Sequence, residues 1–234
     1  MLVSMLQQFK QASLLSETSQ THGAAGKYDF SINAYQMHDA ERVQIESFIK
    51  QGFQRVYGAD ISVTMPTLLA VRNASFKAAL GIRSANEPLF VEQYLSTPIE
   101  HVLMTNGLSV AREHIAEIGH LYSNKSRFAL PLLLTAGVSL FVNEYRYITF
   151  CATSHVRQLV HGAGIAVVDI GEADKATVSS MDNWGTYYDT LPRVVAVSTL
   201  DIMQSIIERP KFLEMFSSLS ARIQCVSNKI AGQK

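Results

Sequence analysis

The sequence predicts one α/β domain in which a mixed β-sheet carries helices on both faces. Its 234 residues suit a single domain of this kind with extra ends, and 47% of them are apolar, enough to fill a large core. Two strands joined by a short hairpin predict antiparallel pairing in the front half. A strand, a buried helix and a second strand predict parallel pairing with a right-handed crossover in the back half.

The strand–helix–strand unit of residues 112–150 is the most informative stretch. Its helix, residues 128–142, has no charged side chain, which is typical of a helix that is buried nearly all round. We expect Ser126 to cap this helix and Pro131 to lie within its first turns. Ligands gather at the carboxyl ends of the strands in such units, and Glu117 lies in the otherwise apolar first strand.

Alternation along that first strand predicts which side chains share a face. The pattern assigns Ile115, Glu117, Gly119 and Leu121 to one face, and Ala116, Ile118, His120 and Tyr122 to the other. An acid flanked by apolar neighbours beneath a buried helix is partly desolvated, which raises its pKa toward values useful for a general base. The alternative for Glu117 is a structural ion pair with Arg83 or Arg127.

The remaining elements follow from periodicity and from turn residues. We expect strands at residues 28–34, 61–72, 76–84, 165–170 and 192–200, and helices at residues 39–57, 89–95, 99–106 and 154–161. Gly58 ends the first of these helices, and Pro66 within the second strand suggests a bulge or a sheet edge. Residues 172–189 are polar and predict a loop.

The two ends of the chain differ from its middle. Residues 1–27 predict a flexible N-terminal extension, because their polar and small side chains beyond residue 15 cannot bury enough surface to become ordered. The α/β domain follows over residues 28–200. Residues 201–234 predict a C-terminal amphipathic helix with apolar side chains at Phe212, Phe216, Leu219, Ile223, Val226 and Ile230. That helix can pack on its own domain, join two subunits as a homodimer, or act on a membrane.

Composition argues against several classes of protein. Twenty acidic and twenty basic residues leave no net charge, whereas nucleic-acid binding needs a basic excess. The two cysteines, Cys151 and Cys225, form neither a disulfide framework nor a CxxC pair, so we expect a reducing compartment and no metal. The sequence shows no ordinary signal peptide, and no apolar run reaches the ~18 residues of a membrane span. We therefore expect a cytoplasmic protein.

Several short motifs occur in one order within residues 39–200. They are GIRSA at Gly81–Ala85, FVEQYL at Phe90–Leu95, PIE at Pro98–Glu100, EIGHL at Glu117–Leu121 and WGTYY at Trp184–Tyr188. Together with the order of the elements, they resemble the thermostable haemolysin family of bacterial proteins. That resemblance implies a GNAT-like fold, the fold of many acyl-CoA N-acyltransferases, and a relation to the acyl-homoserine-lactone synthases.

The resemblance also implies an activity. A GNAT-like N-acyltransferase moves an acyl group from a thioester of coenzyme A (CoA) or acyl carrier protein (ACP) to a small amine acceptor. The thioester would lie in an opening between the two central parallel strands, a backbone N–H of the first strand would stabilise the oxyanion, and Glu117 would act as the base. His155 would reprotonate the leaving thiolate, unless it is a surface or capping histidine. Cys151, four residues earlier, suggests an acyl-enzyme, although a free cysteine in a strand is usually inert core.

The donor's phosphates would lie on the loop after the first central strand, at Leu121, Ser123, Lys125, Ser126 and Arg127. GNAT enzymes usually carry glycine in this loop, and residues 123–127 contain none. Lys125, Arg127 and the following helix N-terminus can hold a phosphate without glycine. Both acyl-CoA and the phosphopantetheine of acyl-ACP therefore stay open as co-substrates. His120 stands where the family resemblance leads us to expect asparagine.

On the acceptor side we place Arg83, Glu92 and Tyr94. Arg83 can bind an acceptor carboxylate through two N–H groups, or it can form an ion pair with Glu92. Tyr94 is either a supporting hydroxyl or a core ring. Trp184 and Tyr187, together with Tyr188, either form a lid over an acyl chain or cover the core.

Two further functions stay open on the sequence. The family name suggests a haemolysin that acts on membranes directly, but the chain has no export signal and its terminal helix carries few cations. The glycine-free loop suggests a non-catalytic GNAT-like scaffold that binds an acyl ligand.

Overall fold

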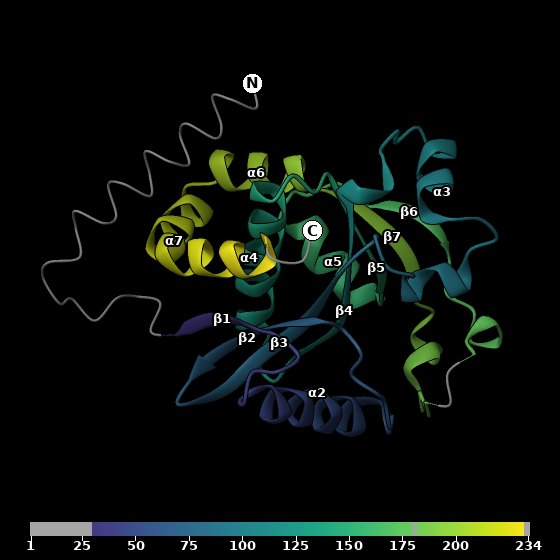
Figure 1. The fold of residues 1–234 in the computed structure, drawn as a ribbon, viewed down its shortest axis with the longest axis horizontal. Coiled ribbons are helices and arrows are strands. Elements are labelled where there is room, and N and C mark those ends of the chain that lie inside the picture. The colour runs from purple at the N-terminus through teal and green to yellow at the C-terminus, as the bar shows by residue number, and fades with distance from the viewer. Residues whose placement is uncertain (1–29, 180–181, 232–234) are drawn as a thin grey trace, which may run out of the picture.

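The computed structural model describes residues 30–179 and 182–231, which form one seven-stranded sheet with helices on both faces (Figure 1). The strand order is β1-β2-β3-β4-β5-β7-β6. The strands are β1 (Ser31–Tyr35), β2 (Thr67–Asn73), β3 (Ser75–Ser84), β4 (Ile115–Ser123), β5 (Tyr147–Ala152), β6 (Val168–Glu172) and β7 (Arg193–Ser198). Among them β4 and β5 alone pair in parallel, so the sheet is mixed, as the sequence predicts.

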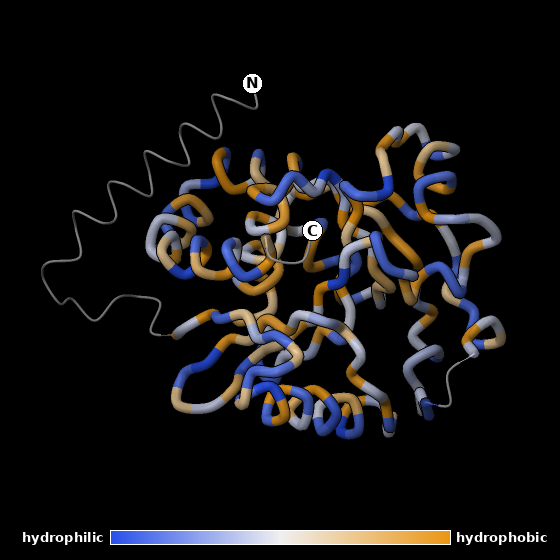
Figure 2. The backbone as a smooth tube through the Cα atoms, viewed as in Figure 1, coloured by the Kyte–Doolittle hydropathy of each residue, from blue (hydrophilic) through white to orange (hydrophobic). Residues whose placement is uncertain are grey.

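Helices cover the two faces unequally. The α-helices are α2 (Arg42–Tyr57), α3 (Ile99–Thr105), α4 (Ala129–Val142), α5 (Ser154–Gly162), α6 (Thr199–Glu208) and α7 (Pro210–Ala231). The 3-10 helices are η1 (Phe90–Tyr94), η2 (Arg112–His114), η3 (Ser126–Phe128), η4 (Lys175–Thr177) and η5 (Tyr187–Thr190). α2 packs on one face of the sheet, and α4, α6 and α7 pack on the other (Figure 1). Polar and apolar residues alternate along α2 and α7, so each turns an apolar side inward (Figure 2).

The charge-free helix predicted from the sequence is α4, at the centre of the larger core. Twelve of its fourteen residues are buried. Pro131 is its third residue, where its missing N–H costs no helical hydrogen bond. The expected cap by Ser126 is wrong: Phe128 precedes the helix without a side-chain bond, and Ser126 instead begins η3. α4 therefore holds its place through packing rather than through a capping interaction.

Other boundaries differ from the sequence prediction. Residues 61–66 form no strand, and β2 begins directly after Pro66, because a proline cannot donate to the sheet ladder. β6 spans residues 168–172 rather than 165–170. The predicted loop of residues 172–189 contains η4 and the start of η5. The expected extension at residues 1–27 and the first two residues of the strand expected at 28–34 lie outside the described residues.

The C-terminal amphipathic helix is present as α7, but a separate helix α6 precedes it. The side chains of Phe216, Leu219, Ile223, Val226 and Ile230 are buried in the same core as α4. α7 therefore packs its apolar side on its own domain, against α4 and β1. Within residues 30–179 and 182–231, no helix combines the length and apolar character that a membrane crossing needs.

The segment of residues 182–191 is docked on the C-terminal end of α2. Asp60 and Asn183 form an isolated antiparallel bridge, and the backbone N–H of Thr186 donates to the carbonyl of Tyr57. Gly185 lies between these contacts with φ +50°, and a Cβ at this position would overlap the Tyr57 carbonyl oxygen. The approach of these two backbones therefore depends on glycine, and it brings Trp184 and Tyr187 under the sheet.

We predict that Gly185→Ala lowers the free energy of unfolding by roughly 3 kcal/mol or more, because the backbones must separate as well as accept an unfavourable φ. Gly107→Ala is the matched control: Gly107 also has a positive φ of +80°, but nothing lies within 4 Å of a Cβ there. The control should cost only the conformational term of about 1–2 kcal/mol. Urea denaturation of both variants measures the difference, and equal losses would contradict the proposed backbone contact.

Candidate active site

An opening lies between the two central parallel strands. β4 and β5 pair over three residues only, from Ile115 opposite Tyr147 to Glu117 opposite Thr149. Beyond that point each strand stays with its outer neighbour: β4 follows β3 to Ser123, and β5 follows β7 to Ala152. The two strands therefore part just after Glu117, as the family resemblance implies. Backbone groups along the parted edges face a gap instead of a partner strand.

A β-bulge in β4 reverses the side-chain alternation beside this opening. Gly119 pairs with Gly81 and Tyr122 pairs with Ala79, so two residues of β4 between these pairs, His120 and Leu121, oppose one of β3, Leu80. His120, at the bulge, has a φ of +54°. Tyr122 consequently packs on the α2 side, against Phe48, and not on the face predicted by simple alternation. The sequence assignment of Leu121 and Tyr122 to faces is wrong for this reason, because Leu121 packs on the core around α4 and Tyr122 packs on the α2 side.

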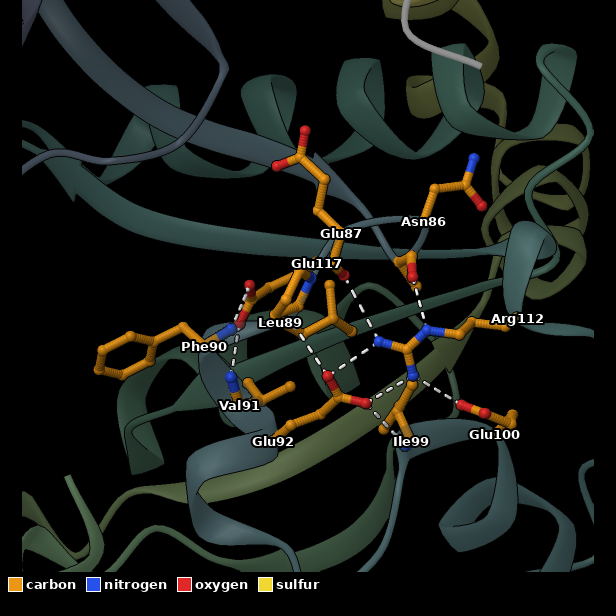
Figure 3. A network of polar contacts seen from close by, with 12 residues as sticks. Asn86, Glu87, Leu89, Phe90, Val91, Glu92, Ile99, Glu100, Arg112 and Glu117 are labelled. Carbon is orange, nitrogen blue, oxygen red and sulfur yellow. Dashed lines mark hydrogen bonds and ion pairs between the residues drawn. The ribbon is translucent and has the colours of Figure 1, made fainter. Parts of the chain in front are cut away.

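Glu117 is buried at the point where the strands part, with 1% of its surface exposed. Its two carboxylate oxygens accept hydrogen bonds from the backbone N–H groups of Phe90 (2.9 Å) and Val91 (2.8 Å), at the start of η1 (Figure 3). Burial raises the pKa of Glu117 from 4.5 to about 7, although the two N–H groups favour the charged form and oppose the increase. The carboxyl group can therefore take up and release a proton near neutral pH.

The ion pairs considered from the sequence, Arg83 or Arg127 with Glu117 and Arg83 with Glu92, do not form. The guanidinium of Arg83 donates to the carbonyl oxygens of Thr64 and Pro88 rather than to Glu117 or Glu92. Arg127 lies over the ring of Phe128. These two arginines therefore leave Glu117 with backbone partners only.

Glu92 pairs with Arg112, a residue that the sequence did not single out (Figure 3). Arg112 contacts both oxygens of Glu92 at 2.6 and 2.9 Å, one oxygen of Glu100 at 2.7 Å, and the carbonyl of Ala85 at 2.6 Å. Burial disfavours the charged form of Glu92, but Arg112 and two backbone N–H groups outweigh it and lower its pKa to about 2. The pair fixes η1 to α3 and does not face the cavity described next.

A cavity of about 400 Å³ opens on the α2 side of the parted strands. Glu117, Tyr94, Trp184 and Tyr187 all line it, so four of the predicted catalytic and acceptor-side residues lie together. Arg83 and Glu92 lie outside its lining. The aromatic walls form a continuous series of ring contacts between 5.5 and 6.3 Å: Phe53 with Tyr187, Tyr187 with Trp184, Trp184 with Phe90, and Phe90 with Tyr94.

A second, smaller cavity of about 70 Å³ lies within the opening and reaches toward α4 and α5. Leu121 lines it, as do Leu133 of α4 and Val156 of α5. Six residues line both cavities: Phe53, Ile118, Gly119, His120, Cys151 and Tyr187. The two spaces therefore meet at the parted strands. This arrangement allows two different molecules to approach one point from opposite sides of the sheet.

His120 lies at the bulge and lines both cavities. Its Nε2 atom is buried and has no hydrogen-bond partner among the described residues. Burial lowers the pKa of His120 to about 4, so the imidazole is neutral at pH 7 and one ring nitrogen can accept a hydrogen bond. Its position depends on the bulge, and periodicity carries no signal for a bulge.

Cys151 and His155 do not form the thiol–imidazole pair considered from the sequence. The Cys151 sulfur lies 3.4 Å from the hydroxyl of Tyr187, and burial raises the pKa of the thiol to about 11. A thiol at that pKa is a poor nucleophile at neutral pH. His155 is exposed and lines neither cavity. Tyr187, and not His155, therefore lies beside the opening.

The predicted donor loop lies at the far end of β4. The hydroxyl of Ser123 donates to the carbonyl of Lys125 at 2.7 Å, which shapes the turn. Lys125, Ser126 and Arg127 are exposed, so their side chains and backbone are available to solvent. Nothing in this loop is a closed phosphate cradle of the glycine-rich kind. Within the described residues, no group of three His, Cys, Asp or Glu side chains is placed to hold a metal ion.

The strand order, the parted β4–β5 pair and the helices on both faces define a GNAT-like acyltransferase fold. The AHL synthase LasI is similar, with a TM-score of 0.52 and 14% identity over 73% of this chain and 89% of that one. The CoA-dependent acyl-homoserine lactone synthase BjaI, in a structure with SAM and isopentyl-CoA, has a TM-score of 0.51 and 12% identity over 77% and 90% of the two chains.

TofI, in a ternary complex with an inhibitor and MTA, has a TM-score of 0.53 and 9% identity over 78% of this chain and 99% of that one. The chain belongs to the thermostable hemolysin family, whose sequence pattern matches residues 35–203. No curated protein matches the sequence significantly. At identities this low, the likeness to the synthases shows the fold alone.

We predict that Arg112→Lys lowers the free energy of unfolding by roughly 2 kcal/mol, because an ammonium cannot replace the planar fork that bridges two carboxylates and a carbonyl. Arg146→Lys, at an exposed arginine, is the control and should change stability by less than about 0.5 kcal/mol.

The pKa of Glu92 is lowered, so its contribution to stability is lost as pH falls from 4.5 toward 2. Urea denaturation at pH 7 and pH 3 should show a smaller acid-induced loss in Arg112→Lys than in the unchanged protein; an equal loss would contradict the role of this pair.

Proposed function

We propose that the protein is an N-acyltransferase that transfers an acyl group from a thioester to an amine acceptor. The observation that supports this most directly is the buried carboxyl group of Glu117. It lies at the place where β4 and β5 separate, and it lines the larger cavity. Its pKa of about 7 suits a general base at neutral pH. The acceptor occupies the larger cavity, and the thioester reaches the opening from the side of α4 and α5.

The transfer uses groups that already lie at the opening. The amine nitrogen attacks the thioester carbonyl carbon and gives a proton to Glu117 as the C–N bond forms. A free backbone N–H on the parted edge of β4 stabilises the carbonyl oxygen as it gains negative charge. The C–S bond then breaks, and the sulfur leaves with a proton from Tyr187, which Glu117 restores. An amide and a free thiol result.

Tyr187 supports this proton transfer better than His155 does. Its ring lines both cavities, whereas His155 lies outside them. Burial raises the pKa of Tyr187 well above its ordinary value, so the hydroxyl keeps its proton until the sulfur leaves. His155 stays a candidate only if the helix α5 moves when the donor binds.

The donor is an acyl thioester of CoA or ACP. The fold resembles that of BjaI, a CoA-dependent synthase whose structure contains isopentyl-CoA. Lys125 and Arg127 are exposed beside the mouth of the opening and suit phosphate groups of either carrier. The donor-side cavity of about 70 Å³ is small, so short acyl groups are the first donors to try.

The first test measures free thiol released from acyl-CoA and acyl-ACP thioesters of graded chain length, with a panel of amines. We expect release that depends on both substrates. In Glu117→Gln the rate should fall by about a hundredfold or more, because the amide cannot accept the amine's proton. Glu208→Gln, at an exposed residue of α6, is the control and should keep full activity.

The pH dependence provides the sharper readout. Glu117 works as a base only when ionised, so kcat/KM should rise with pH up to about 7 and then level off. The same raised pKa predicts that stability falls as pH rises from 4.5 to about 7, because the folded state binds the proton more tightly than the unfolded state. Glu117→Gln should remove both slopes.

Two results would contradict the proposal. Thioester binding without thiol release from any donor would favour the non-catalytic scaffold. Full turnover in Glu117→Gln, with the slope below pH 7 unchanged, would assign the base to another residue. Thermal shift measurements with each thioester separate loss of binding from loss of chemistry.

A further inference from the structure

The walls of the larger cavity carry negative charge and no positive charge. Glu117 and Asp182 are the charged side chains among its described lining residues, and neither lysine nor arginine lines it. The other lining residues are apolar, aromatic or neutral polar. A cavity with this charge attracts a cation and repels an anion. If the proposed function holds, the charge of this cavity indicates which kind of acceptor the protein uses.

The nearest arginines, Arg83 and Arg42, do not line the cavity, and their terminal guanidinium nitrogens donate to backbone carbonyls, while the buried Nε of Arg83 has no partner among the described residues. Arg83 donates to the carbonyl of Thr64 (3.0 Å) and to that of Pro88 (3.2 Å). Arg42 is 3% exposed and donates to Glu46 and to the carbonyls of Met65 and Pro66. An acceptor carboxylate would therefore have to remove Arg83 from these carbonyls before the arginine could bind it, and that exchange would leave the carbonyls without donors.

Two residues that line the cavity, His120 and Asp182, each have a polar atom with no hydrogen-bond partner in the described part of the chain. The buried Nε2 atom of His120 has no partner among the described residues. Oδ1 of Asp182 accepts from the backbone N–H and the hydroxyl of Ser62, and Oδ2 accepts no hydrogen bond from the described part of the chain. An ammonium group has three N–H donors and no acceptor. An ammonium group can therefore donate hydrogen bonds to Nε2 of His120 and to Oδ2 of Asp182.

The aromatic walls suit the same ligand. Phe90, Trp184 and Tyr187 line the cavity as part of one series of packed rings. Ring faces attract cations, with tryptophan the strongest, and the rings also cover apolar carbon. A ligand with a cationic nitrogen on an apolar or aromatic body would therefore be held at both of its ends.

We propose that the acceptor is a primary amine that carries an apolar or aromatic body and no carboxylate. Glu117, Asp182 and neutral His120 hold its ammonium group, and the aromatic walls hold its body. Because this acceptor enters as an ammonium ion, it must lose one proton more than a neutral amine before the amide forms. Glu117 passes that proton to solvent, and the other products are the amide and the free thiol. SAM, which is present in the BjaI structure, has a carboxylate beside its amine and does not meet this description.

The test compares ligands that differ by one carboxylate. Trp184 is the chain's one tryptophan and lines the cavity, so its fluorescence reports binding directly. The pairs are phenethylamine with phenylalanine, and pentylamine with norleucine. We expect each amine to bind at least about tenfold more tightly than its amino acid, which corresponds to about 1.4 kcal/mol. Phenylpropionate, which has the carboxylate alone, should not bind.

Variants show whether the cavity carboxylates cause the preference. Asp182→Asn and Glu117→Gln should each weaken phenethylamine binding about tenfold or more and reduce its advantage over phenylalanine. Glu208→Gln lies on the exposed side of α6 and should change neither value. Circular dichroism confirms that each variant is folded. Equal or tighter binding of the amino acids, or no binding of either amine, would overturn the proposal.

A thiol-release assay with the same compounds separates this inference from the proposed function. Acylation of phenylalanine but not of phenethylamine would keep the transferase and overturn the acceptor assignment. Binding of the amines by Trp184 fluorescence, with no acylation of any compound, would support the binding site and overturn the transferase.

Discussion

The structure depends on one interaction, the binding of the Glu117 carboxylate by the backbone N–H groups of Phe90 and Val91. It joins the central strand β4 to η1, two elements that no sheet pairing connects. It also gives a carboxylate that is almost completely buried two donors, without which its burial would cost several kcal/mol. Because these donors are neutral, desolvation still dominates and the pKa stays near 7 instead of falling. A salt bridge to Arg83 would hold the same side chain but would leave it permanently ionised.

The support for that interaction lies one layer further out. Arg112 joins Glu92 of η1 to Glu100 of α3 and to the backbone at Ala85, so the start of η1 cannot move away from β4 freely (Figure 3). Arg112 keeps Glu92 ionised, whereas burial raises the pKa of Glu117 to about 7. The two acids are only twenty-five positions apart in sequence, yet their surroundings give them different tasks. The first fixes geometry, and the second can exchange protons.

Local sequence predicted much of this arrangement. The charge-free stretch at residues 128–142 predicted a buried crossover helix, and the parallel pair around it followed from connection rules. Glu117 stood out because an acid in an apolar strand needs a reason. The bulge at His120 was not predictable, since it depends on how Gly81 and Ala79 pair with β4 and not on periodicity. Arg112 and Asp182 were missed because their partners are distant in sequence, at Glu92 and Ser62.

The charge of the cavity also bears on turnover. In the proposed transfer, acylation would convert an ammonium ion into a neutral amide and so remove the attraction that the carboxylates of Glu117 and Asp182 exert on the substrate. The product keeps its contacts with the aromatic walls but loses its charge-assisted hydrogen bonds, the stronger part of the binding. Affinity for the acceptor and release of the amide therefore follow from the same two side chains. A cavity that bound its acceptor through an arginine–carboxylate pair would hold the acylated product almost as tightly, because acylation of the nitrogen leaves that pair intact.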